Sequence, residues 1–116
     1  MLEKLKLIEE HYEELNALMA DPEVVTDYVK VAEYAQEQSE LEALVQAYRH
    51  YNALEAELAD TRALMEMEED EESREMAGHE VSRIEAKMED LYARLRLLLL
   101  PRDPKDEKNV IMEIRA

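Results

Sequence analysis

The first twenty residues carry a single apolar stripe at helical spacing. Its members recur every three or four positions: Met1, Leu5, Ile8, Tyr12, Leu15 and Met19. This spacing places them on one face of an α-helix. Because Pro22 has no N–H to donate, the pattern predicts a first helix over residues 1–20.

The next stretch predicts one very long helix. Neither glycine nor proline interrupts the chain between Glu23 and Ala77, and Thr26 or Asp27 is a suitable amino-terminal cap. The apolar stripe comprises Val31, Tyr34, Leu41, Leu44, Tyr48, Tyr51, Leu58 and Met65, with Val45 and Leu54 beside it. A helix over residues 27–67 would be about 60 Å long at ~1.5 Å per residue, which predicts an elongated molecule.

A third helix follows an acidic interruption. Glu66–Glu75 holds seven acidic residues and one arginine, and mutual repulsion makes this run the natural break between helices. Asp70 or Ser73 can cap the third helix, and Pro101 ends it. Its apolar stripe is Ala77, Val81, Ile84, Met88, Leu91, Leu95 and Leu98. We therefore expect an all-α fold, an elongated antiparallel bundle or hairpin of three helices. The first and third helices pack on the two ends or the two sides of the second.

The chain changes character at Pro101. Residues 101–108, PRDPKDEK, are polar and hold two prolines, which is typical of a linker. Residues 109–116, NVIMEIRA, alternate apolar and polar positions like a β-strand. A lone strand leaves its backbone groups unpaired, and nothing upstream offers a partner. The pattern predicts a helical domain over 1–100, a linker over 101–108 and the first strand of a truncated second domain over 109–116. A tail with accidental alternation is the alternative.

Composition narrows the functional classes. The chain has 116 residues, with 14 basic and 30 acidic side chains and a net charge of −16. General nucleic-acid binding needs a surplus of lysine and arginine, so this balance argues against it. No cysteine is present to form a disulfide or a thiolate metal site. Apolar runs are too short to span a bilayer, and no secretory leader precedes the first helix. The sequence favours a soluble, cytoplasmic protein.

The sequence offers no catalytic, cofactor-binding or metal site. His11, His50 and His79 lie one per predicted helix, and none has a second histidine one turn away, as a helical metal site requires. The acidic run Glu66–Glu75 lacks the central glycine of a calcium loop. One glycine cannot build a phosphate-binding loop, and no serine stands in a nucleophile elbow. We expect a binding protein that needs no cofactor, rather than an enzyme.

The carboxyl-terminal fifth of the chain is recognisable. Residues 97–116, LLLLPRDPKDEKNVIMEIRA, resemble the segment joining the first and second domains of bacterial class-I peptide chain release factors. SELEALVQAYRHY (Ser39–Tyr51) and ESREMA (Glu72–Ala77) resemble the amino-terminal helical domain of that family. The resemblance covers the whole chain. The linker from Pro101 to Asn109 is more similar to the branch that reads UAA and UAG than to the branch that reads UGA.

The resemblance implies a role in translation termination, in which the parent factor recognises stop codons and triggers peptidyl-tRNA hydrolysis on the ribosome. The family's codon-reading tripeptide and Gly-Gly-Gln loop both lie outside this chain. The fragment would therefore bind and position without catalysis of its own. The implied partners are the ribosome at its GTPase-associated region, a GTPase release factor and the remaining domains of the parent chain, with no membrane. An unrelated coiled-coil adaptor or self-association module is the alternative.

Three sets of side chains are candidates for contact with partners. Tyrosines 12, 34, 48 and 51 share the apolar stripes, and we expect them to pack with hydroxyls toward solvent rather than to stack nucleobases. The acidic rows Glu9/Glu13, Glu10/Glu14 and Glu33/Glu37/Glu40 are either tolerated surface or a docking face for a basic ribosomal protein. The basic residues Arg94, Arg96, Arg102, Lys105 and Lys108 gather near the end of the third helix. The first two complement the helix dipole, and the set is also suited to contacting other domains or ribosomal RNA.

Overall fold

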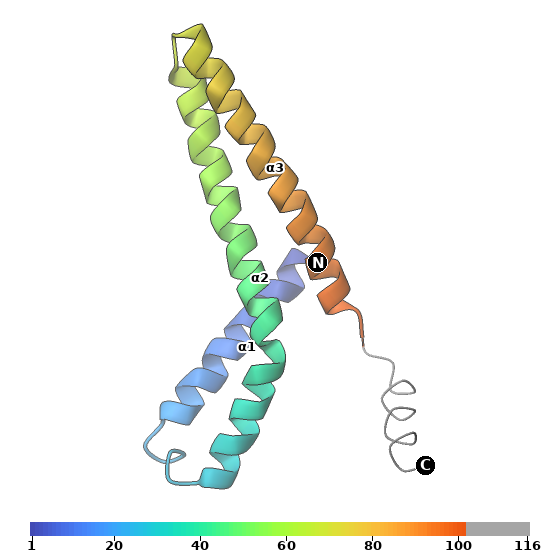
Figure 1. Cartoon of the computed structure of the whole chain (residues 1–116). Helices are drawn as coiled ribbons and strands as arrows, with labels where there is room; N and C mark the ends of the chain where they lie inside the picture. The colour runs from blue at the N-terminus through green and yellow to red at the C-terminus, as the bar shows by residue number, and fades with distance from the viewer. Residues whose placement is uncertain (102–116) are drawn as a thin grey trace, which may run out of the picture.

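A computed structural model describes residues 1–101 as three long helices joined by short turns (Figure 1). The helices are α1 (Leu2–Ala20), α2 (Tyr28–Met67) and α3 (Glu71–Leu99). The all-α prediction is confirmed, and each helix begins and ends close to the position that the sequence indicates. The predicted strand at 109–116, and the predicted linker beyond Pro101, lie outside the described residues.

Aspartates begin the two longer helices. The Asp27 carboxylate accepts a hydrogen bond from the Lys30 backbone N–H at 3.2 Å, which caps α2. Asp70 caps α3, accepting from the Ser73 backbone N–H at 3.1 Å and from its hydroxyl at 2.9 Å. The sequence offers two possible caps for each of these helices, and in both cases it is the aspartate that caps the helix. A carboxylate satisfies a free N–H and also adds negative charge at the positive end of the helix dipole.

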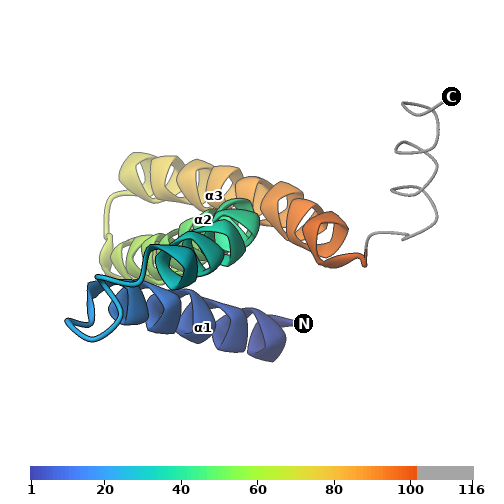
Figure 2. The ribbon, with the colours of Figure 1, turned by 90° about the horizontal axis from the view of Figure 1, so that it is seen from below.

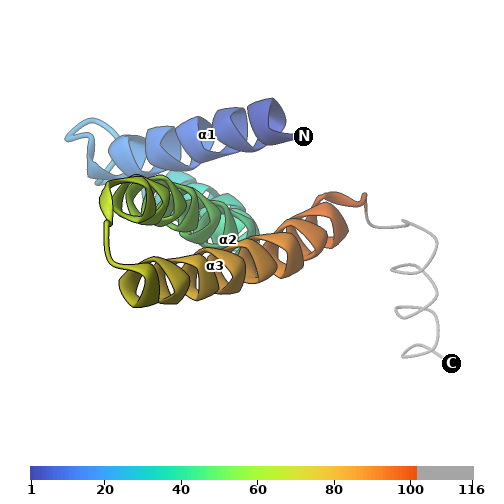
Figure 3. The ribbon, with the colours of Figure 1, turned by 90° about the horizontal axis from the view of Figure 1, so that it is seen from above.

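α2 is the central helix, and both other helices pack against it. α1 runs antiparallel along its amino-terminal half, and α3 runs antiparallel along its carboxyl-terminal half (Figure 1). Viewed from below and from above, α2 lies between the other two helices (Figures 2 and 3). Within residues 1–101, the backbones approach closely only between α1 and α2 and between α2 and α3. α1 and α3 therefore occupy different ends and also different sides of α2. The principal extents of 64 × 43 × 20 Å confirm the elongated shape.

Two apolar clusters hold the helices together. The first forms where all three meet, from Leu5, Leu44, Ala47, Tyr48 and Leu95. The second belongs to the α2·α3 hairpin alone, from Leu54, Leu58 and Ile84. Full burial of a leucine or isoleucine side chain stabilises a fold by about 1.5–3 kcal/mol, so these clusters are the main source of stability.

The apolar stripe of α3 shifts by one residue at its end. Leu98 is 38% exposed, whereas Leu99 packs against the first cluster. The 4-3 spacing read from the sequence repeats every seven residues, or 3.5 per turn, while a straight α-helix has about 3.6. Over several turns this difference rotates Leu98 away from α2 and brings Leu99 into line with Leu95. The prediction that Leu98 continues the stripe is wrong for this reason.

Candidate docking surfaces

The α1·α2 contact is lined with charged side chains. Arg49 of α2 reaches across to α1, donating from Nε to Glu9 at 2.9 Å and from Nη2 to Glu13. Its guanidinium also lies 5.5 Å from the ring centroid of Tyr12. Hydrogen bonds to Glu9 and then to Glu13 raise the pKa of Arg49. Arg49 therefore offsets one of the two negative charges of the row Glu9/Glu13 and holds both carboxylates against α2.

A second set of polar contacts extends the α1·α2 contact toward the amino-terminal end of α2. His11 Nε2 lies 2.6 Å from the Glu37 Oε1 atom, and this hydrogen bond is the largest cause of the raised pKa of His11. The Tyr12 hydroxyl donates to Glu42, which raises the pKa of Tyr12 and lowers that of Glu42. His11 and Tyr12 thus connect two helices, which accounts for both residues without a ligand.

The other candidate tyrosines are buried or partly buried along α2. Tyr48 is 8% exposed in the three-helix cluster, and Tyr34 is half-buried. Tyr51 packs against the first cluster and lies beside Tyr92 of α3, with ring centroids 6.1 Å apart and planes at 50°. The rings of Tyr48 and Tyr51 are therefore used for helix packing.

The remaining histidines and the acidic run form no metal centre in the described part of the chain. His50 and His79 are exposed on different helices. Within residues 1–101, no group of three His, Cys, Asp or Glu side chains is placed to hold a metal ion. In the acidic run, Asp70 caps α3, and Arg74 Nη2 donates to the Glu68 carbonyl oxygen at 2.8 Å. Of the described helices, none is long and apolar enough to cross a membrane.

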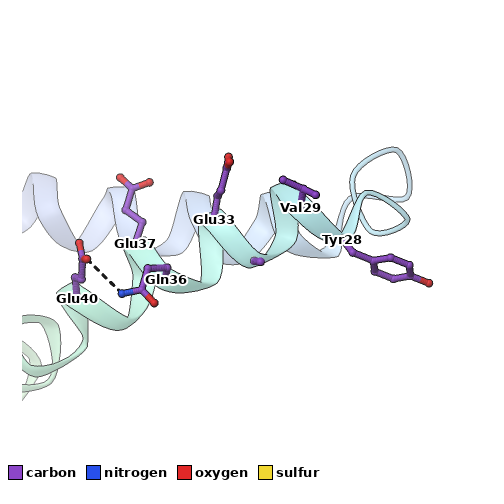
Figure 4. Close-up of a pocket in the computed structure, with 7 residues that line it drawn as sticks. Tyr28, Val29, Glu33, Gln36, Glu37 and Glu40 are labelled. Carbon is purple, nitrogen blue, oxygen red and sulfur yellow. Dashed lines mark hydrogen bonds between the residues drawn. The ribbon is translucent and has the colours of Figure 1, made fainter.

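One side of the amino-terminal half of α2 is left uncovered, and we call it the open face. Its residues are Tyr28, Val29, Ala32, Glu33, Gln36, Glu37 and Glu40 (Figure 4). Tyr28 is 83% exposed and Val29 is 69% exposed. Figure 4 shows Glu33 and Glu37 projecting from the helix and Tyr28 extending beyond its amino-terminal end. Within residues 1–101, neither Glu33 nor Glu40 forms an ion pair. The open face therefore combines exposed apolar groups with free negative charge.

Only part of the predicted basic cluster is described. Arg94 and Arg96 are exposed near the carboxyl end of α3, where positive charge is favourable beside the helix dipole. Arg94 also lines a hollow of about 360 Å³ between α2 and α3, together with His50. Arg102, Lys105 and Lys108 lie outside the described residues, so their relation to the two arginines stays a prediction.

Comparison with known proteins identifies a family and a set of relatives. The PCRF domain matches residues 8–116. The chain is 49% identical over 116 residues to peptide chain release factor 1 of Geobacillus sp. (strain WCH70), and 50% identical to that of Bacillus subtilis (strain 168). Release factor 1 of Lysinibacillus sphaericus (strain C3-41) is 44% identical. All of this chain is covered in each comparison, but only 32%, 33% and 32% of the respective relatives. The chain therefore spans about a third of their length. No solved structure gave a significant match.

Proposed function

Because the chain belongs to the PCRF domain family, we propose that it is the amino-terminal helical domain of a peptide chain release factor that acts in translation termination. The observation that carries this proposal is an identity of 49–50% along the entire chain to two proteins named peptide chain release factor 1. The parent factor would recognise UAA and UAG and trigger peptidyl-tRNA hydrolysis on cytoplasmic ribosomes. Within it, residues 1–100 form the helical domain, 101–108 a linker, and 109–116 the first strand of the next domain.

This domain binds and positions the parent factor and performs no chemistry itself. Its polar contacts support that role, because the described ion pairs join helices to one another or lie along exposed helix faces. The stripe of α2 is used inside one chain, since Leu44 and Tyr48 pack between residues of α1 and α3. A coiled-coil adaptor would need that stripe for a partner, so the internal packing favours the release-factor proposal.

The open face of α2 is the surface we assign to a basic ribosomal protein. Among the acidic rows, Glu9 and Glu13 are both engaged by Arg49, which offsets one of their two charges. Glu33 and Glu40 stay available, next to the exposed Tyr28 and Val29. Complementary charge mainly accelerates and orients association, while the apolar groups supply contact area. The GTPase release factor and the ribosome's GTPase-associated region are the proposed partners of the domain as a whole.

A chimaeric factor tests the proposal. Residues 1–116 replace the matching third of Bacillus subtilis release factor 1, and peptide release is measured on ribosomes stalled at UAA, UAG or UGA. We expect release at UAA and UAG from the chimaera and none from the isolated 116-residue chain. A folded chimaera that binds no ribosomes, or release by the isolated chain, would contradict the proposed role.

The docking surface is tested in the same chimaera with charge reversals. The double variant Glu33→Lys/Glu40→Lys should weaken ribosome binding, seen mainly as a slower association rate at low salt. Asp60→Lys/Asp90→Lys is the matched control, with the same charge change at two exposed positions inside α2 and α3. Equal losses in both variants would show that overall charge matters and that the open face does not. Sedimentation of the 116-residue chain as a tight dimer would favour the coiled-coil alternative.

A further inference from the structure

A hollow lined by aromatic and acidic side chains runs along the α2·α3 hairpin. Its volume is about 320 Å³, and its lining residues are Tyr51, Leu58, Glu85, Met88, Glu89 and Tyr92. We call it the tyrosine groove. Leu58 is buried at 8% exposure, and Tyr92 at the rim is 37% exposed. The groove therefore has an apolar floor and a partly open aromatic wall.

Negative charge surrounds this apolar floor. Glu85 is held by Arg62, whose Nη2 lies 3.2 Å from its Oε2. Glu89 makes no ion pair within residues 1–101. Glu55 lies close enough that its charge, after burial as the main cause, raises the pKa of Tyr51. The groove thus offers the Glu89 carboxylate and two tyrosine rings to a ligand.

This combination is suited to a cation carried on an apolar stem. The face of a tyrosine ring attracts arginine or lysine within about 6 Å, and neighbouring carboxylates strengthen that preference. The molecule already contains one such contact, where the Arg49 guanidinium lies over Tyr12 and binds two glutamates. The tyrosine groove likewise combines tyrosine rings with a carboxylate, and within residues 1–101 no arginine lies over its rings.

We propose that the tyrosine groove binds an arginine side chain from a basic amphipathic helix of another protein. The apolar floor receives the aliphatic part of the arginine and a neighbouring apolar side chain, while Glu89 faces the guanidinium. A second copy of this chain is a poor occupant, because its net charge of −16 makes association of like surfaces unfavourable. Nucleic acid and anionic lipid are repelled for the same reason. The proposal does not depend on the release-factor assignment.

The test uses the 116-residue chain and a synthetic amphipathic helical peptide of about 18 residues with leucines on one face and arginines on the other. A second peptide replaces each arginine by citrulline, which keeps the shape and removes the charge. Binding is measured by calorimetry at low and high salt. We expect the citrulline peptide to bind at least about tenfold more weakly, and the arginine peptide to lose affinity with added salt.

Variants locate the binding site. Tyr92→Leu keeps an apolar side chain but removes the ring, and should weaken arginine-peptide binding roughly two- to fivefold. Tyr92→Phe should bind like the unmodified chain. Glu89→Lys should weaken binding about fivefold, whereas Asp90→Lys, with the same charge change at the next position of α3, should have little effect. Thermal unfolding followed by circular dichroism checks that each variant is folded.

Several outcomes would overturn the proposal. Equal affinity for the arginine and citrulline peptides would show that charge is not recognised. Equal losses in Glu89→Lys and Asp90→Lys would indicate general electrostatic attraction instead of a groove. Tighter binding of a single-stranded oligonucleotide or of anionic vesicles than of the arginine peptide would assign the surface to a different partner.

Discussion

The two helix–helix contacts of this protein differ in the chemistry of the side chains that form them. The α2·α3 hairpin rests on Leu54, Leu58 and Ile84, with ion pairs such as Arg62–Glu85 at its exposed edges. The α1·α2 contact also buries leucines, but its length is spanned by polar links from Arg49, His11 and Tyr12 to glutamates on the facing helix. One contact is mostly apolar, and the other is a mixture of apolar and ionic interactions.

This difference indicates that the two contacts respond to different conditions. Apolar burial is insensitive to salt and nearly insensitive to pH, whereas exposed ion pairs are screened by salt and change with protonation. We therefore expect the hairpin to set the overall stability of the domain. The attachment of α1 should be the part that salt, pH and charge substitutions alter.

The largest expected effect comes from removing a buried side chain of the hairpin. Ile84 is 0% exposed in the α2·α3 cluster, and Ile84→Ala leaves a cavity between two long helices. We expect a loss of about 2–5 kcal/mol in the free energy of unfolding, measured by urea denaturation. Leu15→Ala is the matched substitution in α1, where Leu15 is 1% exposed.

Hydrogen exchange separates these two substitutions. Leu15→Ala should accelerate exchange mainly within α1, because α2 and α3 retain their own cluster. Ile84→Ala should accelerate exchange across the hairpin and, through the shared three-helix cluster, in α1 as well. Identical exchange patterns for the two variants would mean that the domain unfolds as one unit and that the two contacts are not separable.

Arg49 tests the ionic part of the α1·α2 contact. Arg49→Met keeps an apolar stem over Tyr12 but leaves Glu9 and Glu13 facing α2 without a counter-charge. Because the arginine side chain is 40% exposed, solvent screening limits the expected loss to about 1 kcal/mol. The difference in stability between the variant and the unmodified chain should shrink at ~1 M salt, where the Debye length is only about 3 Å. A difference that is independent of salt would assign the loss to packing.

A substitution at Gly78 should stabilise the α2·α3 hairpin instead of weakening it. It lies inside α3, and a Cβ atom built on it would meet only the flexible end of Met65 at 3.6 Å, an ordinary contact distance. Gly78→Ala should therefore stabilise the domain by about 0.5–1 kcal/mol through its higher helix propensity. The melting temperature measures this gain, and exchange in α1 should not change. A lower melting temperature would show that the hairpin is more tightly packed at this position than its contacts indicate.

The helices of this protein follow from local sequence, while its ionic contacts do not. Pro22 and Pro101 follow the ends of helices, and Asp27 and Asp70 cap their beginnings. Each of these signals acts on residues close to it in the sequence, so the pattern alone locates α1, α2 and α3. Arg49 and Glu9 are forty positions apart. Their pairing depends on which face of α2 receives α1, and periodicity does not decide that.

The candidate surfaces show the same limit. All the acidic rows look equivalent in the sequence, yet packing pairs Glu9 and Glu13 with Arg49 and leaves Glu33 exposed on the open face. The tyrosine groove is not recognisable from any single stretch of the sequence, because Tyr51 and Tyr92 come together only when α3 folds back on α2. A search for aromatic and acidic residues on the facing stripes of an expected hairpin would have been the signal.

The smallest expected effect is a pH dependence of the α1·α2 contact. The hydrogen bond to Glu37 raises the pKa of His11 above its usual 6.5 in the folded chain. A folded-state pKa above the unfolded value means that this contribution to stability is fully present below about pH 6.5 and is lost as pH rises through the folded pKa. Because both side chains are about half exposed, the change should be no more than about 0.5 kcal/mol, seen as faster exchange in α1 at pH 9 than at pH 6 after correction for the intrinsic rate. Glu37→Gln removes the charge that favours the imidazolium, so it should return the His11 pKa, measured by NMR, toward 6.5 and abolish the pH step. If the change in exchange with pH persists in Glu37→Gln, another group is responsible for it, and the His11–Glu37 contact does not cause the pH dependence.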